Sequence, residues 1–179
     1  LPVKEFNDDQ FIFMATETGS VKKTKLSAYS RPMKSGIKAI KLRDGDRVVN
    51  AEITDGTKEI MLFSNSGKSI RFKESDARPM GRVSQGVRGM RIDKDQKIIS
   101  LVVLEEGNIL VATENGYGKQ TLKEEFSIQK RGGKGVIAIQ TSDRNGNLIG
   151  AKQVSTGDEV MFISTSGNLI RTRTDDISC

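Results

Sequence analysis

Apolar and polar residues alternate in blocks along this chain, and the blocks recur at a nearly fixed interval. Four glycines mark the recurrence, at spacings of 48 (67 − 19), 49 (116 − 67) and 51 (167 − 116) residues: Gly19, Gly67, Gly116 and Gly167. A short apolar run precedes each glycine, and such runs are typical of strands buried on both faces. The runs are Phe11–Thr16, Ile60–Ser64, Ile109–Thr113 and Val160–Ser164. Because Thr-Gly, Ser-Gly and Asn-Gly favour tight turns, each run is predicted to open a β-hairpin.

The segments after each hairpin repeat as well. A second strand with cations follows every turn, and a cationic loop then leads to Gly36-Ile37, Gly86-Val87 or Gly135-Val136. Each of these pairs is predicted to begin a third strand, over residues 37–42, 87–92 and 136–140. A fourth strand is expected to close each unit, over residues 48–53, 98–104 and 148–154, and residues 1–6 match this closing strand.

A unit of about 50 residues with four strands has the size of a propeller blade. We expect an all-β, propeller-like single domain over residues 1–179, with about four blades of four-stranded antiparallel sheets. The approximate units are 1–47, 48–97, 98–147 and 148–179, the last incomplete. Residues 119–125 could form a short helical turn at most. Because one unit cannot bury its apolar strands alone, neighbouring units must stack; two consecutive β-sandwiches are the alternative that the steady period disfavours.

Composition adds a preference for an anionic partner. The 179 residues include 29 Lys and Arg against 23 Asp and Glu, a formal charge of +6 that could also serve solubility alone. The 18 glycines and 3 prolines favour many tight turns, and one cysteine excludes an internal disulfide. No apolar run could cross a bilayer, and no signal peptide is evident. Because the chain opens with Leu1, it is expected to be a piece of a longer polypeptide.

The residues that usually carry catalysis are missing. The chain has no histidine, which removes the commonest general base, and one cysteine cannot build a zinc cluster. Gly132-Gly133-Lys134-Gly135 is no Walker A loop, because neither Ser nor Thr follows the lysine. Tyr29 and Tyr117 lack an acid–base or metal setting. We predict no catalytic residue and no metal site in this chain.

Recurrent cations instead predict contacts to nucleic-acid phosphates. One set follows the hairpin turns, and another precedes the Gly–β-branched pairs, so stacked blades would place each set along one rim. The strongest candidate is the loop Gln129, Lys130, Arg131, Gly132, Gly133, Lys134 and Gly135, where glycines let backbone amides approach a phosphate. The other candidates are Lys22, Lys23, Arg31, Lys34, Arg71, Arg78, Arg82, Lys119 and Arg171. The alternative for cations on outer strands is protection against edge pairing.

Duplex DNA is the expected form of the nucleic acid. Only 5% of the residues are aromatic, so platforms for stacking the bases of single strands are poor. Bending a duplex around the rim would cost about 1–6 kcal/mol per 20–30 base pairs, which several phosphate contacts must offset.

The heptad from Gln129 to Gly135 resembles the Q-R-R-G-G-K-G box of the C-terminal domain of the DNA gyrase A subunit, with Lys130 as the one departure. Similar segments are Ser30-Arg31-Pro32, Met80-Gly81-Arg82, Gly86-Val87-Arg88-Gly89, Asn115 to Lys119, and Ile170 to Arg173. The resemblance implies a β-pinwheel whose blades exchange strands and whose basic rim wraps duplex DNA. It also implies a parent type II topoisomerase that introduces negative supercoils using ATP, with its cleavage tyrosine outside this chain.

The same resemblance implies the partners and the cellular setting. The implied partners are double-stranded DNA, the N-terminal region of the gyrase A protein and the gyrase B protein. The two proteins would form a heterotetramer with two copies of each. The implied location is the bacterial cytoplasm at the nucleoid, and no membrane partner is expected. No cofactor is expected on this chain, and ATP and Mg²⁺ belong elsewhere in the parent enzyme.

The position of the heptad departs from the family pattern. The box usually belongs to the first blade, whereas about two and a half units precede it here, so an auxiliary box-like loop is an open interpretation. The C-terminal domain of the topoisomerase IV A subunit is the close alternative, although it lacks a clear box. A propeller-like module that binds proteins is the alternative from another class, and an independent enzyme is the weakest interpretation.

Overall fold

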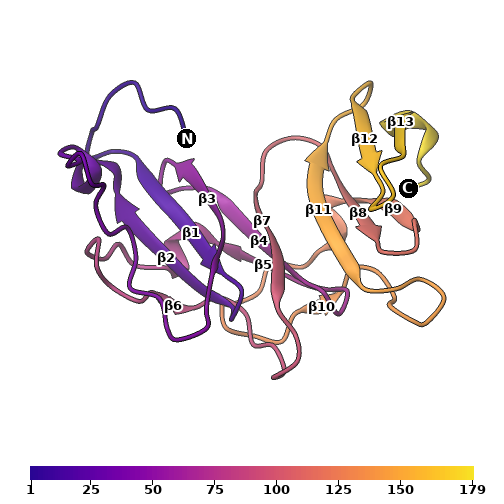
Figure 1. Cartoon of the computed structure of the whole chain (residues 1–179), viewed down its shortest axis with the longest axis horizontal. Coiled ribbons are helices and arrows are strands. Elements are labelled where there is room, and N and C mark those ends of the chain that lie inside the picture. The colour runs from indigo at the N-terminus through magenta and orange to yellow at the C-terminus, as the bar shows by residue number, and fades with distance from the viewer.

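The computed structural model describes residues 1–179, and it places the blades side by side along an open arc (Figure 1). Blade 1 has the strand order β3-β1-β2-β6, and blade 2 has the order β10-β5-β4-β7. Blade 3 consists of β11-β8-β9, and blade 4 is the single hairpin β12-β13. All ladders between these strands are antiparallel, as the sequence predicted.

Four hairpins of similar length carry the blades. Their strands are β1 (Phe11–Thr16) with β2 (Ser20–Lys25), β4 (Glu59–Ser64) with β5 (Lys68–Lys73), β8 (Asn108–Thr113) with β9 (Gly118–Leu122), and β12 (Glu159–Ile163) with β13 (Leu169–Arg173). Closing strands β3 (Val48–Thr54), β7 (Ile98–Val103) and β11 (Leu148–Val154) pair with the first strand of the preceding hairpin. The four glycines expected in the turns are all in the left-handed region, with φ between 78° and 86°.

Each hairpin ends in a single 3-10 turn. These turns are η1 (Leu26–Tyr29), η2 (Glu74–Asp76), η3 (Lys123–Glu125) and η4 (Thr174–Asp176). The short helical turn expected within residues 119–125 is η3, preceded by strand β9. None of these short helices could span a membrane.

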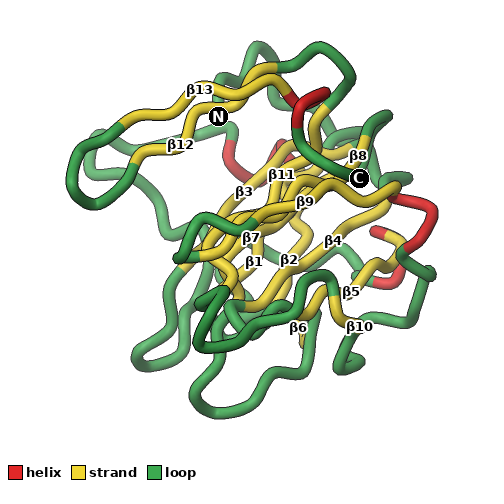
Figure 2. Tube along the Cα trace, turned by 90° about the vertical axis from the view of Figure 1, so that its right-hand side faces the viewer, coloured by secondary structure: helices red, strands yellow, loops and turns green.

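Blades 1 and 2 each receive a strand from the following repeat. The strand β6 (Val87–Arg88) pairs with β2, and β10 (Val136–Ile137) pairs with β5. Both short strands lie on the same lower edge of the molecule, in the orthogonal view as well (Figure 2). Neighbouring blades therefore exchange strands, as in a β-pinwheel.

The predicted third strands were too long. Strands over 87–92 and 136–140 shrink to two residues each, and residues 37–42 form none. Pairing stops because the amides of Gly89 and Met90 both donate to the Gly19 carbonyl, which turns the chain away from the ladder. Residues 1–6 also form no strand, and no upstream hairpin exists in this chain with which they or residues 37–42 could pair.

The hydrophobic cores lie between blades. Along β4, alternate side chains point to opposite faces: Ile60 and Leu62 enter the core shared with blade 1, whereas Met61 and Phe63 enter the core shared with blade 3. All four are fully buried. The prediction of strands buried on both faces is thereby confirmed for β4.

Blade 4 departs from that pattern. Met161, Ile163, Leu169 and Ile170 on its hairpin are each more than half exposed. No further blade in the chain covers this hairpin, so the prediction of burial on both faces was wrong for it.

Candidate nucleic-acid interface

The heptad loop, residues 129–135, lies on the outer edge between η3 and β10 and is fixed by backbone hydrogen bonds. The Gln129 amide donates to the Arg71 carbonyl at 2.8 Å, and the Gly132 amide donates to the Gly89 carbonyl at 2.6 Å. The Gly133 carbonyl accepts from the Arg91 amide at 2.8 Å. The loop is thus held against both blade 2 and the segment that blade 1 receives.

The glycines of the heptad serve packing first. Gly135 has a φ of +74°, and a Cβ there would lie 2.2 Å from the Ser69 carbonyl oxygen. Gly132 has a φ of +83°, which also favours glycine. The amides of Gly133 and Lys134 make no hydrogen bond within the chain, so they remain available to an anion.

The two lysines of the heptad face solvent. The Lys130 side chain is 92% exposed, and its Nζ lies 3.4 Å from Asp76 Oδ1. Lys134 is exposed and forms no ion pair. Both side chains can therefore reach a phosphate without giving up a strong internal partner.

Arg131 is placed differently from the lysines. Its Nε donates to the Asp76 carbonyl at 2.8 Å, and its Nη1 donates to the Arg88 carbonyl at 2.9 Å. Arg82 in the preceding repeat likewise donates from Nη1 to the Lys38 carbonyl, at 2.6 Å. Both guanidinium groups are partly engaged by backbone oxygens, so the predicted phosphate contacts at Arg131 and Arg82 would use their remaining N–H groups.

At the fourth residue after three of the four turn glycines, a side-chain N–H group joins neighbouring blades. Lys23 Nζ donates to the Glu74 carbonyl at 3.3 Å, and Arg71 Nη1 donates to the Phe126 carbonyl at 3.1 Å and to Lys123. Gln120 Nε2 donates at the same position of the next hairpin, to the Ile177 carbonyl at 3.1 Å and to Thr174. We call Lys23, Arg71 and Gln120 the interblade donors. Their recurrence reflects junctions between blades, so Lys23 and Arg71 do not form part of an exposed rim.

Lys22 is buried as well. Its Nζ donates to the Ala39 carbonyl at 2.5 Å and to the Arg82 carbonyl. Burial and then the nearby positive charge of Arg82 lower the Lys22 pKa to about 8. The predicted DNA contact at Lys22 is corrected, because its side chain has no exposed surface.

The remaining predicted cations are exposed: Arg31, Lys34, Arg78, Lys119 and Arg171. Arg171 pairs with Glu159 through its Nε, at 2.8 Å. The structure does not bring these side chains together with the heptad through any hydrogen bond or ion pair.

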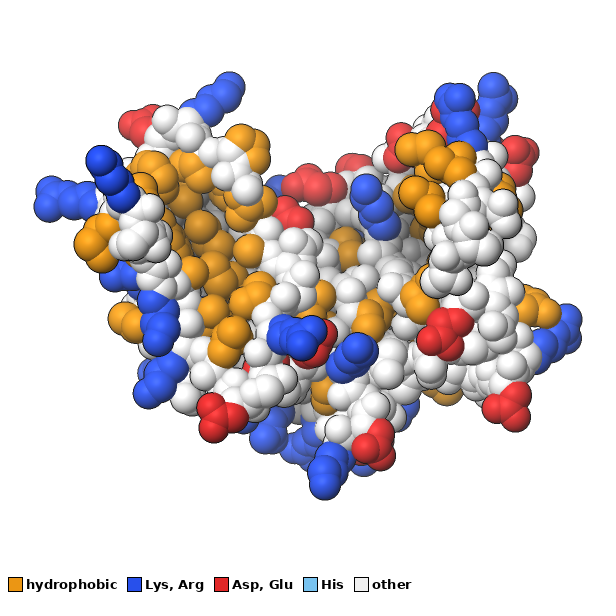
Figure 3. All heavy atoms as spheres, in the orientation of Figure 1, with side chains coloured by type: hydrophobic (Ala, Val, Ile, Leu, Met, Phe, Trp, Pro, Cys, Tyr) orange, Lys and Arg blue, Asp and Glu red, His pale blue; other side chains and the backbone are white.

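The backbones of two exposed arginines that sequence reasoning did not select contact the heptad. Gly132 packs on the Arg88 backbone and side chain, and the Arg91 amide donates to the Gly133 carbonyl. We call Arg88, Arg91, Lys130 and Lys134 the loop cluster. Sequence reasoning could have found Arg88 and Arg91 from their position after the Gly86-Val87 pair, in the segment that contacts the loop of the next repeat. Figure 3 shows Lys and Arg side chains along the lower and left outline of the molecule.

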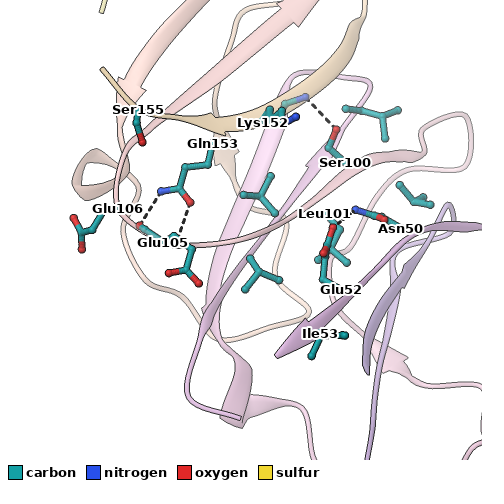
Figure 4. Close-up of a pocket in the computed structure, with 15 residues that line it drawn as sticks. Asn50, Glu52, Ile53, Ser100, Leu101, Glu105, Glu106, Lys152, Gln153 and Ser155 are labelled. Atoms are coloured by element: carbon teal, nitrogen blue, oxygen red, sulfur yellow. Dashed lines mark hydrogen bonds between the residues drawn. The ribbon is translucent and has the colours of Figure 1, made fainter. Parts of the chain in front are cut away.

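The inner side of the arc is hollowed between the closing strands. A hollow of about 670 Å³ between β3, β7 and β11 is lined by three carboxylates, Glu52, Glu105 and Glu106, and one cation, Lys152 (Figure 4). Gln153 is tied there by hydrogen bonds with the Glu105 backbone, at 2.7 and 2.8 Å. The residues of the chain include no group of three acidic or thiol side chains placed to hold a metal ion. Two of these carboxylates are ion-paired, Glu105 with Lys58 at 2.7 Å and Glu106 with Lys123 at 3.2 Å.

Comparison with known proteins agrees with this architecture. The family model described as "DNA gyrase C-terminal domain, beta-propeller" matches residues 10–55, 58–105, 107–155 and 158–179. The DNA gyrase A protein of Pseudomonas aeruginosa is 54% identical over 169 residues, which cover 94% of this chain and 18% of that protein. The DNA gyrase A protein of Escherichia coli is 48% identical over 179 residues, covering 99% of this chain and 20% of that protein.

Solved structures match over nearly the whole chain. The C-terminal domain of a DNA topoisomerase IV superposes with a TM-score of 0.93 at 26% identity, covering 99% of this chain and 56% of that one. A DNA gyrase A C-terminal domain superposes with a TM-score of 0.86 at 28% identity, covering 98% of this chain and 59% of that one. The chain spans about a fifth of the length of the curated relatives it matches. It belongs to the family of DNA gyrase C-terminal domains.

Proposed function

We propose that this chain binds duplex DNA along its outer edge and bends it, as the C-terminal domain of a DNA gyrase A protein. The observation that carries the proposal is the loop cluster, four exposed cations in and beside the heptad. The sequence relatives, which are DNA gyrase A proteins, support the same assignment.

The contacts would be made to phosphates, so binding would be salt-dependent and largely blind to sequence. Lys130 and Lys134 supply mobile ammonium groups, and Arg88 and Arg91 add positive charge beside the same loop. The free amides of Gly133 and Lys134 could donate to a phosphate oxygen between these side chains. Each neutralised phosphate would release counterions and add about 0.9 to the slope of log K against log salt.

For the whole protein, the proposal is a bacterial type II topoisomerase that introduces negative supercoils. This chain would present wrapped DNA to the N-terminal region of the gyrase A protein, which carries the cleavage tyrosine. ATP and Mg²⁺ would act on other parts of a heterotetramer that also contains two gyrase B proteins. The proposed location is the bacterial cytoplasm.

The test is a measurement of DNA affinity and bending across a salt series. Duplexes labelled at both ends report bending by energy transfer, and the native chain is compared with the triple variant Arg91→Gln/Lys130→Gln/Lys134→Gln. We expect the triple variant to bind more weakly, with a slope reduced by about 3. The matched control is Lys152→Gln, which removes one exposed charge from the hollow. The proposal fails if the native chain neither binds nor bends DNA at low salt, or if the control weakens binding as much as the triple variant.

The C-terminal domain of topoisomerase IV is the second candidate, favoured by the TM-score of 0.93. The heptad and the relatives at 54% and 48% identity favour gyrase. Joined to the rest of its parent protein, a gyrase domain would support introduction of negative supercoils, whereas the alternative would not.

A further inference from the structure

Arg131 joins two blades from within the heptad loop. Its Nε donates to the carbonyl of Asp76, the last residue of η2 in blade 2. Its Nη1 donates to the carbonyl of Arg88, which lies in the strand that blade 1 receives. One guanidinium therefore spans the outer edge of the junction between blades 1 and 2.

One of these two hydrogen bonds, that from Nη1, occurs one repeat earlier as well. Arg82 donates from Nη1 to the Lys38 carbonyl, and the donors and acceptors are displaced by 49 (131 − 82) and 50 (88 − 38) residues. These displacements match the period of the repeat. The contact is thus a recurrent element of the fold and not a chance conformation of one side chain.

The neighbouring lysines have no comparable role. The Lys130 side chain is 92% exposed, and Lys134 has no internal partner. The heptad accordingly presents two cations outward and one inward. The inward cation also lies beside the Gly132 amide, whose bond to the Gly89 carbonyl closes the loop onto the same segment.

We propose that Arg131 is a positioning residue that fixes the angle between blades 1 and 2 at the outer edge, and so sets the curvature of the path along which DNA is bent. This inference rests on the proposed DNA-bending function. In DNA bending, Lys130 and Lys134 contribute to the affinity for DNA, whereas Arg131 sets the curvature of the surface to which the DNA binds.

The chemistry of the two cations allows a clean separation. Arginine is a planar fork that can donate in two directions from Nε and Nη1, whereas lysine is a single point donor. Arg131→Lys keeps the charge but cannot hold the Asp76 and Arg88 carbonyls together. If Arg131 acted as a phosphate contact, the lysine would largely preserve binding.

The experiment compares native chain and Arg131→Lys by three measurements. Amide hydrogen exchange at Gly132 reports the junction without DNA, and we expect about tenfold faster exchange in the variant. Energy transfer on end-labelled duplex should fall to less than about half of the native gain, while the salt slope stays within about 1 of the native value. Lys152→Arg, a lysine–arginine exchange in the hollow, is the control and should change none of the three. Circular dichroism verifies that the variant is folded.

The outcomes separate this inference from the proposed function. Native-like bending with unchanged Gly132 exchange would overturn the role of Arg131 while leaving DNA bending intact. Native bending despite faster Gly132 exchange would show that the junction contact does not set the curvature, and it would also overturn the inference. If the native chain fails to bind DNA, the proposed function and the curvature role fall together, although faster Gly132 exchange would still establish the junction contact.

Discussion

The turn glycines offer the sharpest test of strand exchange, because equivalent positions differ only in what packs on them. Gly67 and Gly116 occupy the same place in successive hairpins, with φ of +78° and +81°. A Cβ at Gly67 would lie 2.1 Å from the Ile139 carbonyl oxygen, whereas a Cβ at Gly116 would meet nothing within 4 Å. The hairpin of Gly67 (β4 and β5) receives an exchanged segment, whereas the hairpin of Gly116 (β8 and β9) does not.

The magnitudes follow from two separate effects. Alanine in the left-handed region costs about 1–2 kcal/mol, and this applies to Gly67→Ala and Gly116→Ala alike. At Gly67 the chain at Ile139 must also move, which weakens the bonds from the Ala138 and Ile139 amides to the Gly67 carbonyl, at 2.8 and 3.1 Å. Each bond contributes about 0.5–1.5 kcal/mol. We therefore expect losses of about 2–5 kcal/mol for Gly67→Ala and about 1–2 kcal/mol for Gly116→Ala.

The assay is equilibrium unfolding in urea, followed by circular dichroism and extrapolated linearly to water. The difference between the two variants isolates the exchanged segment, since the backbone strain is common to both. Equal losses, within about 0.5 kcal/mol, would refute the conclusion that the segment after β10 packs on this turn in solution. The same comparison can be repeated in the first and last hairpins.

Three further predictions concern stability. The Lys22 pKa is about 8 in the folded chain and 10.5 ordinarily, so between these pH values the unfolded chain binds more protons than the folded chain. Lys22 therefore makes the free energy of unfolding rise with pH across that interval, by up to about 3 kcal/mol. Urea titrations at several pH values should show the rise, and Lys22→Met should flatten it. Arg71→Met should lower the free energy of unfolding by about 1.5–3 kcal/mol, because it removes the hydrogen bonds that a mostly buried guanidinium donates. Arg171→Met, at the equivalent exposed position, should lower it by less than about 0.5 kcal/mol. Equal losses would contradict the junction role of Arg71. Phe63→Ala should cost about 3–5 kcal/mol by leaving a cavity, against less than about 0.5 kcal/mol for Ile163→Ala, and comparable thermal shifts would show that blade 4 is covered in solution.

Local patterns in the sequence predicted the hairpins because each depends on neighbouring residues. A turn glycine at a steady interval and an apolar run before it specify a strand pair without reference to the rest of the chain. The exchanged strands depend instead on residues far along the sequence, as with Val87 against Val21. Two residues are too few to produce a periodic signal, so the sequence suggested longer strands than exist.

The buried cations could not be distinguished from the exposed ones by residue type. Lys23 and Arg71 resembled members of a basic band, but the same position in the next hairpin holds the neutral Gln120. What the three interblade donors share is an N–H group that reaches a carbonyl of the next turn. An uncharged residue at that position was the one sequence feature that argued for junctions. In the heptad, by contrast, the exposure of Lys130 and Lys134 is consistent with the predicted anion-binding loop.

Strand exchange also has a consequence for how such a chain can change its length in evolution. The second and third repeats each give a short strand to the repeat before them, and the first and second repeats each receive one, so a repeat joined in this way does not complete its sheet alone. If one whole repeat of about 50 residues is removed or inserted between equivalent positions, each strand that is given to a neighbouring blade still finds a blade that receives it. Removal of half a repeat would leave one sheet without its exchanged strand and would leave another strand without a partner. The number of blades is therefore free to vary in whole steps, and the contour along the outer edge lengthens or shortens with it.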